Sequence, residues 1–190
     1  MSINTSKITI HMVSSLDGFI GRQDGDISWM QPYDKYEKGD ELTEEEIAAF
    51  LKHIDCYVMG SKTYEHALEL GWPYGDVPVT VLTKRKLKSE RETVTFYSGD
   101  LSKFVEEQLR PNFQNIWMVG GSKLTKEFIR LKLADEIVIS IMPIILGDGI
   151  LFFDHIGKEQ TLHLKNTRAY NDGMVELTYE ILKEAISNNT

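Results

Sequence analysis

Segments rich in β-branched and apolar residues alternate along this chain with segments of helical spacing, and this alternation constrains the fold more than any other feature. Strands are predicted over residues 7–13, 55–59, 78–83, 93–97, 116–119, 134–146, 161–170 and 174–182. Helices are predicted after the capping residue Thr43, over 62–70, from Asp100 or Ser102 to Leu109, and over 122–131. Strands that alternate with helices are joined by right-handed crossovers into a mostly parallel sheet.

The last two strands break this alternation. Asn171-Asp172-Gly173 joins them directly, and such a turn favours an antiparallel hairpin. The length of 190 residues suits one packed domain. We therefore expect a single domain, residues 1–190, with an α/β three-layer sandwich fold: a mostly parallel central sheet that ends in an antiparallel C-terminal hairpin.

Composition excludes several classes of function. The formal charge of -8 opposes binding to nucleic-acid phosphates, so we expect a small-molecule partner and no nucleic acid. The only cysteine is Cys56, and the five histidines are dispersed, so neither a disulfide nor a metal site is predicted. No apolar run approaches the ~20 residues that span a bilayer, which predicts no membrane association and, with the reducing environment that one cysteine suits, a cytoplasmic location.

Two predicted strands run directly into glycine turns that begin helices, Gly60-Ser61-Lys62-Thr63 and Val119-Gly120-Gly121-Ser122. A residue without a Cβ lets backbone N–H groups approach a phosphate, and a helix N-terminus adds unpaired donors and a positive dipole end. Either turn alone is equally well explained as a tight connection, but two together favour a dinucleotide site. The Walker A and Rossmann patterns are both incomplete here, which argues against a nucleotide triphosphatase.

Thr83-Lys84-Arg85-Lys86 follows the third predicted strand and offers one hydroxyl and three cations. Such a group suits the 2'-phosphate of NADPH, which favours NADPH over NADH. The alternative is an ordinary solvated basic loop.

The loop after the first strand ends in an aromatic, a proline and an acid: Trp29, Pro32 and Asp34. An acid among apolar side chains can hold a proton near neutral pH and donate it during a reduction. From composition alone, Asp34 is better explained as an exposed acid at the start of a helix than as a proton donor.

The same residues carry a family resemblance. Ser15-Leu16-Asp17-Gly18 and the segment 21–29, with proline three and acid five residues after the tryptophan, resemble the first loop of dihydrofolate reductases. The two glycine turns and Val81-Leu82-Thr83 resemble the cofactor-binding turns and strand of that family. The segment 143–149 with Phe152 is similar instead to the reductase domain of the bifunctional riboflavin-biosynthesis deaminase-reductases, which share the fold.

The resemblance implies a role for each matching residue. It places Asp34 at the position of the catalytic proton donor. The residues that it places at the substrate are Asp17, Phe19, Trp29 and Tyr64. Those that it places at NADPH are Val13, Ile20, Gly21, Gly60, Ser61, Lys62, Thr63, Leu82, Thr83, Lys84, Arg85, Val119, Gly120, Gly121, Ser122, Lys123 and Leu124.

Three departures bear on the substrate. Val77 stands where dihydrofolate reductases keep the arginine that binds the glutamyl carboxylate of folate, which argues against folate. Thr125 replaces their aromatic after the paired glycines, and Phe19 replaces a lysine of the riboflavin-type enzymes, which weakens the case for a phosphoribosyl substrate.

These observations predict an NADPH-dependent oxidoreductase that transfers hydride to a small pyrimidine- or pteridine-like heterocycle. Two alternatives remain: a true dihydrofolate reductase, and a binding protein of this fold with weak catalysis. The apolar segments 137–146 and 150–153 exceed what one sheet edge should expose, so we also expect a homodimer.

Overall fold

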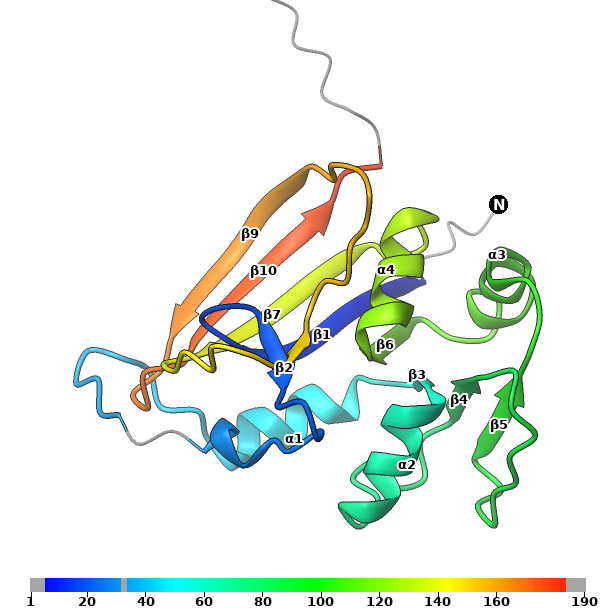
Figure 1. Ribbon diagram of the computed structural model, residues 1–190, viewed down its shortest axis with the longest axis horizontal. Helices are drawn as coiled ribbons and strands as arrows, with labels where there is room; N and C mark the ends of the chain where they lie inside the picture. The colour runs from blue at the N-terminus through cyan, green and yellow to red at the C-terminus, as the bar shows by residue number, and fades with distance from the viewer. Residues whose placement is uncertain (1–5, 32–33, 184–190) are drawn as a thin grey trace, which may run out of the picture.

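The computed structural model describes residues 6–31 and 34–183, and within them the chain forms an α/β fold around an eight-stranded sheet (Figure 1). The strand order across the sheet is β5 (Val94–Tyr97), β4 (Val79–Leu82), β3 (Cys56–Gly60), β6 (Asn115–Gly120), β1 (Lys7–Ser15), β7 (Glu136–Met142), β10 (Val175–Ile181) and β9 (Leu162–Ala169). All neighbours from β5 to β7 are parallel, whereas β10 is antiparallel to both β7 and β9. The predicted parallel sheet with its C-terminal hairpin is confirmed.

Helices cover both faces of the sheet. Successive strand residues point to opposite faces, and Ile8 and Ile10 of β1 pack in one core cluster with Phe128 of α4 (Ser122–Arg130). α3 (Leu101–Phe104) and the π-helical turn that continues it (Val105–Leu109) contribute to the same cluster. On the other face, Met59 of β3 packs with Tyr64 of α2 (Ser61–Glu69). This face is also the one on which α1 (Glu44–Lys52) lies.

Two helix starts follow from their capping residues. The Thr43 side chain accepts a hydrogen bond from the Glu46 backbone, and the Glu46 side chain accepts one from the Thr43 backbone, so α1 begins with a capping box. Asp100 caps α3 in a similar way by accepting from the Lys103 backbone. The helix predicted as far as Leu109 is present, but its second half is a π-helical turn rather than an α-helix.

The apolar run 134–146, in which Pro143 indicates either a bend or a sheet edge, lies inside the sheet. Its strand β7 pairs with β1 on one side and with β10 on the other. The strand ends at Met142, because the next residue is Pro143, which has no N–H to donate to a neighbouring strand. The small sheet of β2 (Phe19–Gly21) and β8 (Ile150–Leu151) was not predicted.

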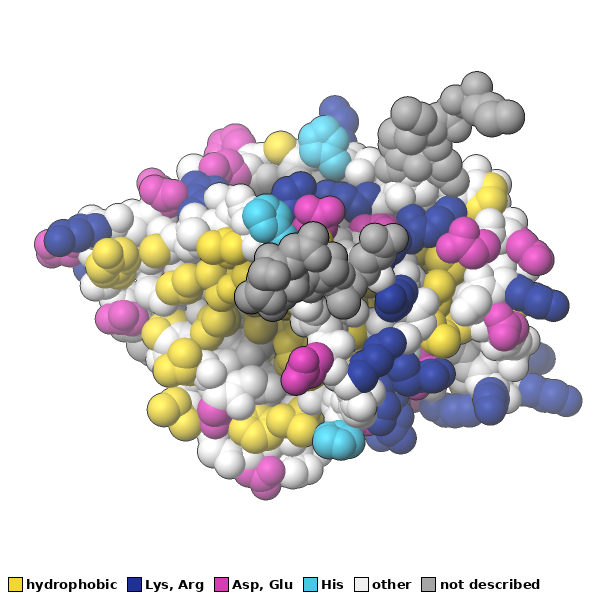
Figure 2. Space-filling model, turned by 90° about the horizontal axis from the view of Figure 1, so that it is seen from above, with side chains coloured by type: hydrophobic (Ala, Val, Ile, Leu, Met, Phe, Trp, Pro, Cys, Tyr) yellow, Lys and Arg dark blue, Asp and Glu magenta, His cyan; other side chains and the backbone are white. Residues whose placement is uncertain are grey.

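Two surface features bear on function. On the face shown in Figure 2, hydrophobic side chains gather on the left, where β9 and β10 lie in Figure 1, and most Lys and Arg side chains lie on the right. α1 buries none of its residues, and Ile47 and Phe50 stay 42% and 41% exposed.

Within the described ranges, no helix combines the length and apolar character that a membrane crossing needs.

Candidate functional site

A large open cavity of about 2290 Å³ lies at the carboxyl ends of the parallel strands and continues over the sheet face beneath α1. Ligands of open α/β sheets settle at this end of the strands. The volume exceeds that of a site for one drug-sized ligand. We distinguish its turn side, formed by residues 60–63, 82–84 and 121–124, from its sheet side, formed by the cavity residues of β1, β7, β9, β10 and α1 and by Trp117 of β6.

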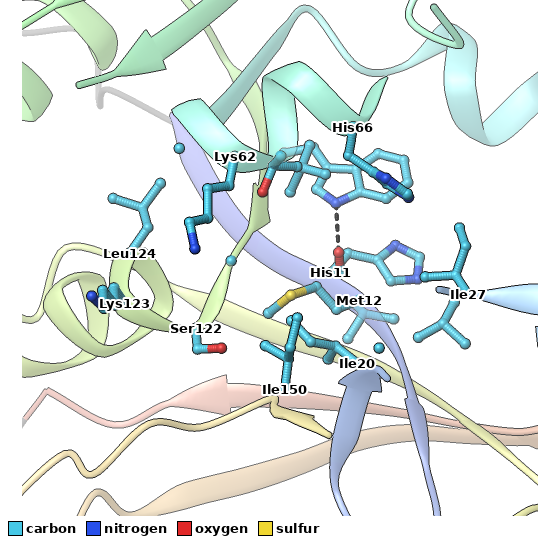
Figure 3. A pocket seen from close by; sticks show the side chains of 18 of the residues that line it. His11, Met12, Ile20, Ile27, Lys62, His66, Ser122, Lys123, Leu124 and Ile150 are labelled. Atoms are coloured by element: carbon cyan, nitrogen blue, oxygen red, sulfur yellow. Dashed lines mark hydrogen bonds between the residues drawn. The ribbon is translucent and has the colours of Figure 1, made fainter. Parts of the chain in front are cut away.

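The two glycine turns lie next to each other on the turn side. β3 and β6 are neighbouring parallel strands in which Met59 is opposite Gly120, so α2 and α4 begin side by side. Neither helix has a side-chain cap, which leaves backbone N–H groups of both first turns for a ligand. Figure 3 shows Lys62 of α2 pointing into the space between the two helices.

The three glycines of these turns differ in whether the fold leaves room for a side chain at their position. The φ angles of Gly60 and Gly121 are -83° and -81°, which any residue adopts. A Cβ on either would meet no protein atom closer than 3.9 Å and 3.8 Å, respectively. Gly120 instead has a φ of +118°, and its Cβ would lie 2.6 Å from Met12 Sδ. The fold therefore requires Gly120, whereas Gly60 and Gly121 keep the cavity open to close approach of a ligand.

Cations line the turn side without being neutralised there. Among the described residues, Lys62, Lys84 and Lys123 line the cavity and form no salt bridge. Lys126, by contrast, lies 3.6 Å from Asp154. These lysines and the helix N-termini give the turn side a positive field that suits phosphate groups.

Arg85 does not belong to this set. Its guanidinium forms a bidentate pair with Glu65, with N–O distances of 2.9 and 2.7 Å, and it lies outside the cavity lining. Glu65 holds the pKa of Arg85 above its ordinary value through this hydrogen bond and the charge that it carries.

The other predicted cofactor residues gather at the cavity with one exception. Gly120 does not line it, because the Gly120 backbone faces Met12 instead. The predicted residues that do line it are Val13, Ile20, Gly21, Gly60, Ser61, Lys62, Thr63, Leu82, Thr83, Lys84, Val119, Gly121, Ser122, Lys123 and Leu124.

The predicted substrate residues lie elsewhere, and their positions do not support that role. Tyr64 is buried in the core with its ring edge-on to Trp72. The Asp17 carboxylate accepts hydrogen bonds from the Ser15 hydroxyl and from the backbone of residues 146 and 147, so it fixes a turn. Phe19 pairs with β8, and Trp29 lies in a separate recess.

Asp34 is exposed and also lies outside the large cavity. It lines the recess that holds Trp29, and its carboxylate lies against Gly173, where a Cβ would be 2.7 Å from Oδ2. Helix α1, which lies over the sheet side of the cavity, begins only at Glu44. Asp34 is therefore not part of that helix. This placement keeps Asp34 apart from the residues that line the large cavity, and its role as proton donor stays a prediction. Pro32 and Tyr33 lie outside the described residues.

The sheet side is built from residues that sequence reasoning missed. One cross-strand row runs through Val13 of β1, Ser140 of β7, Glu176 of β10 and Arg168 of β9, and all four line the cavity. The Ser140 hydroxyl donates to Glu176 Oε2 over 3.3 Å. The Nε2 atom of His11, one row away, lies 3.9 Å from the same oxygen.

Aromatic rings form the walls of this half. The His11 ring stacks on Trp117 at 4.8 Å, and Phe50 of α1 meets both rings edge-on at 5.5 Å. The Trp117 indole N–H donates to the His11 carbonyl, the dashed line in Figure 3. Helix α1 thus turns its unburied apolar face toward the cavity.

Burial sets the charge states on the sheet side. It lowers the pKa of His11 to about 4, so the imidazole is neutral at pH 7 and its contact with Glu176 is not an ion pair. Burial also raises the pKa of Glu176, against the Ser140 hydrogen bond and the charge of Arg168, which lower it. Arg168 itself is held by Asp40 at 2.8 Å and by Glu46 at 3.1 Å.

A sequence signal for this group did exist. His11, Ser140 and Glu176 are polar residues within predicted strands, and all three occupy the strand face opposite the helix α4 core. Only strand pairing shows that they meet, because they lie far apart along the chain.

Known proteins share this architecture. The family model of the RibD C-terminal domain matches residues 6–176. The protein YwjB of Bacillus subtilis (strain 168) is 31% identical over 175 residues, which cover 91% of this chain and 97% of YwjB.

Solved structures show the same fold. A riboflavin biosynthesis-like protein of Shewanella sp. PV-4 superimposes with a TM-score of 0.79 at 22% identity, covering 93% of this chain and 99% of that one. The diaminohydroxyphosphoribosylaminopyrimidine deaminase/5-amino-6-(5-phosphoribosylamino)uracil reductase of Thermotoga maritima has a TM-score of 0.66 at 17% identity, covering 93% of this chain and 57% of that longer one. The chain belongs to the RibD C-terminal domain family.

Proposed function

We propose that this chain is an NADPH-dependent reductase that transfers hydride to a small pyrimidine- or pteridine-like heterocycle. The observation that carries the proposal is the pair of open glycine turns at residues 60 and 121, which adjoin an aromatic-walled cavity over the sheet. The Thermotoga maritima relative is named as a reductase of a substituted uracil, which supports the same class of substrate.

The residues of the turn side fit a dinucleotide phosphate. The backbone at Gly60 and Gly121 would hold the pyrophosphate, with Lys62 and Lys123 as its counter-charges. Thr83 and Lys84 would bind the 2'-phosphate, the group that separates NADPH from NADH. When bound, the cofactor supplies the hydride, and the protein supplies position and surroundings.

The chain's own residues have two tasks next to the cofactor. Val13 and Ile20 line the cavity where the turn side meets the sheet side, and they would form the apolar surface against which flat rings stack. Phe50 and Trp117 would enclose a planar substrate and exclude water from it.

Two measurements test this function. NADPH should raise the melting temperature of the protein more than NADH does, since a ligand selective for the native state stabilises it. Absorbance at 340 nm then follows NADPH oxidation with a panel of aminopyrimidines, pterins and flavin precursors. Turnover of at least one of these heterocycles is expected, and no effect of NADPH on melting would contradict the proposal.

The same assay separates the alternatives. Oxidation of NADPH by dihydrofolate at a rate above that of every other substrate would identify a true dihydrofolate reductase. NADPH binding without turnover of any heterocycle would instead identify a binding protein.

A further inference from the structure

The two halves of the cavity differ in charge. On the turn side, lysines without salt bridges face the ligand space. On the sheet side, the charged lining residues are the acids Glu46, Glu136 and Glu176 and a single cation, Arg168. Asp40 and Glu46 already hold that cation, so the described residues leave the sheet side without a free positive charge.

This charge distribution bears on phosphorylated substrates. A phosphate on the sheet side would meet carboxylates and a neutral histidine, and it would have to displace acids from Arg168. Like charges in a partly desolvated site disfavour such a ligand. Phe19, at the position of a lysine in riboflavin-type reductases, adds no charge and does not line the cavity, although its partner strand β8 does.

The Glu176 carboxylate is available for a ligand. Its side chain is 24% exposed, and Oε2 accepts from Ser140 while Oε1 accepts no hydrogen bond from the described residues. Ser140 donates to Oε2, and the neutral His11 ring lies 3.9 Å from the same oxygen. A half-buried carboxylate with free acceptor positions favours a ligand that brings N–H donors, because hydrogen bonds to charged groups are the stronger ones.

We propose that the sheet side recognises an unphosphorylated planar nitrogen heterocycle through a ring N–H and an adjacent amino group, both donating to the Glu176 carboxylate. This inference rests on the proposed function for the identity of the substrate pocket. Phe50, Trp117 and His11 enclose the ring, and Ser140 orients the carboxylate. The resulting substrate class differs from the phosphoribosyl compound in the name of the Thermotoga maritima relative.

The test uses cofactor-free full-length protein and isothermal titration with 2,4-diaminoquinazoline, whose protonated ring nitrogen lies beside an amino group. Wild type should bind it, and Glu176→Gln should weaken binding at least about tenfold through loss of a charged acceptor. Glu180→Gln, the same change at an exposed position of the same strand, should bind like wild type. Equal affinity of wild type and Glu176→Gln, or no binding to wild type, would overturn the proposal.

Two further arms keep the test decisive. If Glu176→Gln does not fold, Ser140→Ala replaces it and should weaken binding about threefold, whereas unchanged affinity would count against the proposal. Ribose 5-phosphate should not compete with the diaminoquinazoline, and competition would show that the sheet side accepts phosphate. NADPH binding is titrated separately, so its failure would remove the proposed function while leaving this recognition site standing.

Discussion

Gly60 and Gly120 lie side by side at the ends of β3 and β6, with the Cβ position of Gly60 3.9 Å from the carbonyl oxygen of Gly120. This contact brings two helix N-termini to one cavity. The two glycines differ in role: the fold requires Gly120, whereas the fold does not require Gly60, whose backbone stays open to a ligand.

The glycines therefore provide the first prediction. Gly60→Ala should melt at or slightly above the wild-type temperature, because its φ suits any residue, and the methyl group added in Gly60→Ala or in Gly121→Ala meets no close atom. Each should weaken NADPH binding at least about tenfold in calorimetric titration. Gly120→Ala is the contrasting variant and should lower the melting temperature instead. Undiminished NADPH affinity in both Gly60→Ala and Gly121→Ala would refute the assignment of the turns.

Cofactor preference should depend on Lys84 and much less on Arg85. Lys84 lines the cavity without a salt bridge, whereas Glu65 holds Arg85 outside it. Lys84→Ala should reduce the ratio of NADPH to NADH affinity about tenfold, and Arg85→Ala should change it less than twofold. The reverse ranking of the two variants would show that Arg85 leaves Glu65 to bind the phosphate.

The stability of the protein should fall between pH 6.5 and pH 4. The pKa of His11 is about 4 in the folded protein and about 6.5 in an unfolded chain, so the unfolded state takes up the proton first as the pH falls. The loss amounts to about 3 kcal/mol at most, and Glu176, whose pKa is raised, acts in the opposite direction. Urea unfolding of wild type and His11→Gln across this range isolates the effect.

The difference in unfolding free energy between these two proteins should shrink toward pH 4. His163→Gln, at an exposed position, serves as the control and should follow the wild-type profile. Parallel pH profiles of wild type and His11→Gln would contradict the role of His11.

Arg110 should be the most important single cation for stability. Its side chain is 12% exposed, and it donates to the carbonyls of Ser6 and Leu133 and to both carboxylate oxygens of Asp135. Arg110→Ala should cost about 2–3 kcal/mol in chemical unfolding, because it removes four part-buried hydrogen bonds, two of them to a carboxylate. Arg130→Ala, which removes an exposed pair with Glu127, should cost less than about 0.5 kcal/mol. Equal costs for the two variants would contradict this ranking.

We propose that the chain forms a homodimer through the β9–β10 face rather than through β7. β9 is an edge strand, Leu162 and Leu164 are 37% and 48% exposed, and hydrophobic side chains gather on this side in Figure 2. Wild type should sediment as a dimer at micromolar concentration and Leu164→Glu as a monomer. Leu68→Glu, at an exposed leucine of α2, should remain dimeric. Monomeric wild type would rule the dimer out.

Local signals in the sequence predicted most of the fold. The Thr43 cap, the glycine turns and the turn at Asn171–Gly173 each involve only a few neighbouring residues. Every helix or strand that begins or ends at one of them is present. The position of the strand over 134–146 inside the sheet could not be predicted, because its neighbours in the sheet come from distant segments. The pairing of β2 with β8 was missed for the same reason.

The candidate site divides in the same way. Its two glycine turns could be predicted, because each is a continuous segment with its own glycine, lysine and helix start. Its sheet side could not, because Glu176 meets Ser140 and His11 only through strand pairing across three strands. Asp34 shows the converse: a matching spacing after Trp29 did not bring it to the cavity, since α1 starts ten residues later.

The most direct test is a crystal structure of the NADPH complex. The pyrophosphate should contact the backbone at residues 60–62 and 121–123, with the nicotinamide ring against Val13 and Ile20 and facing the sheet side. A cofactor bound elsewhere, or bound here with its nicotinamide turned away from His11 and Glu176, would contradict the account.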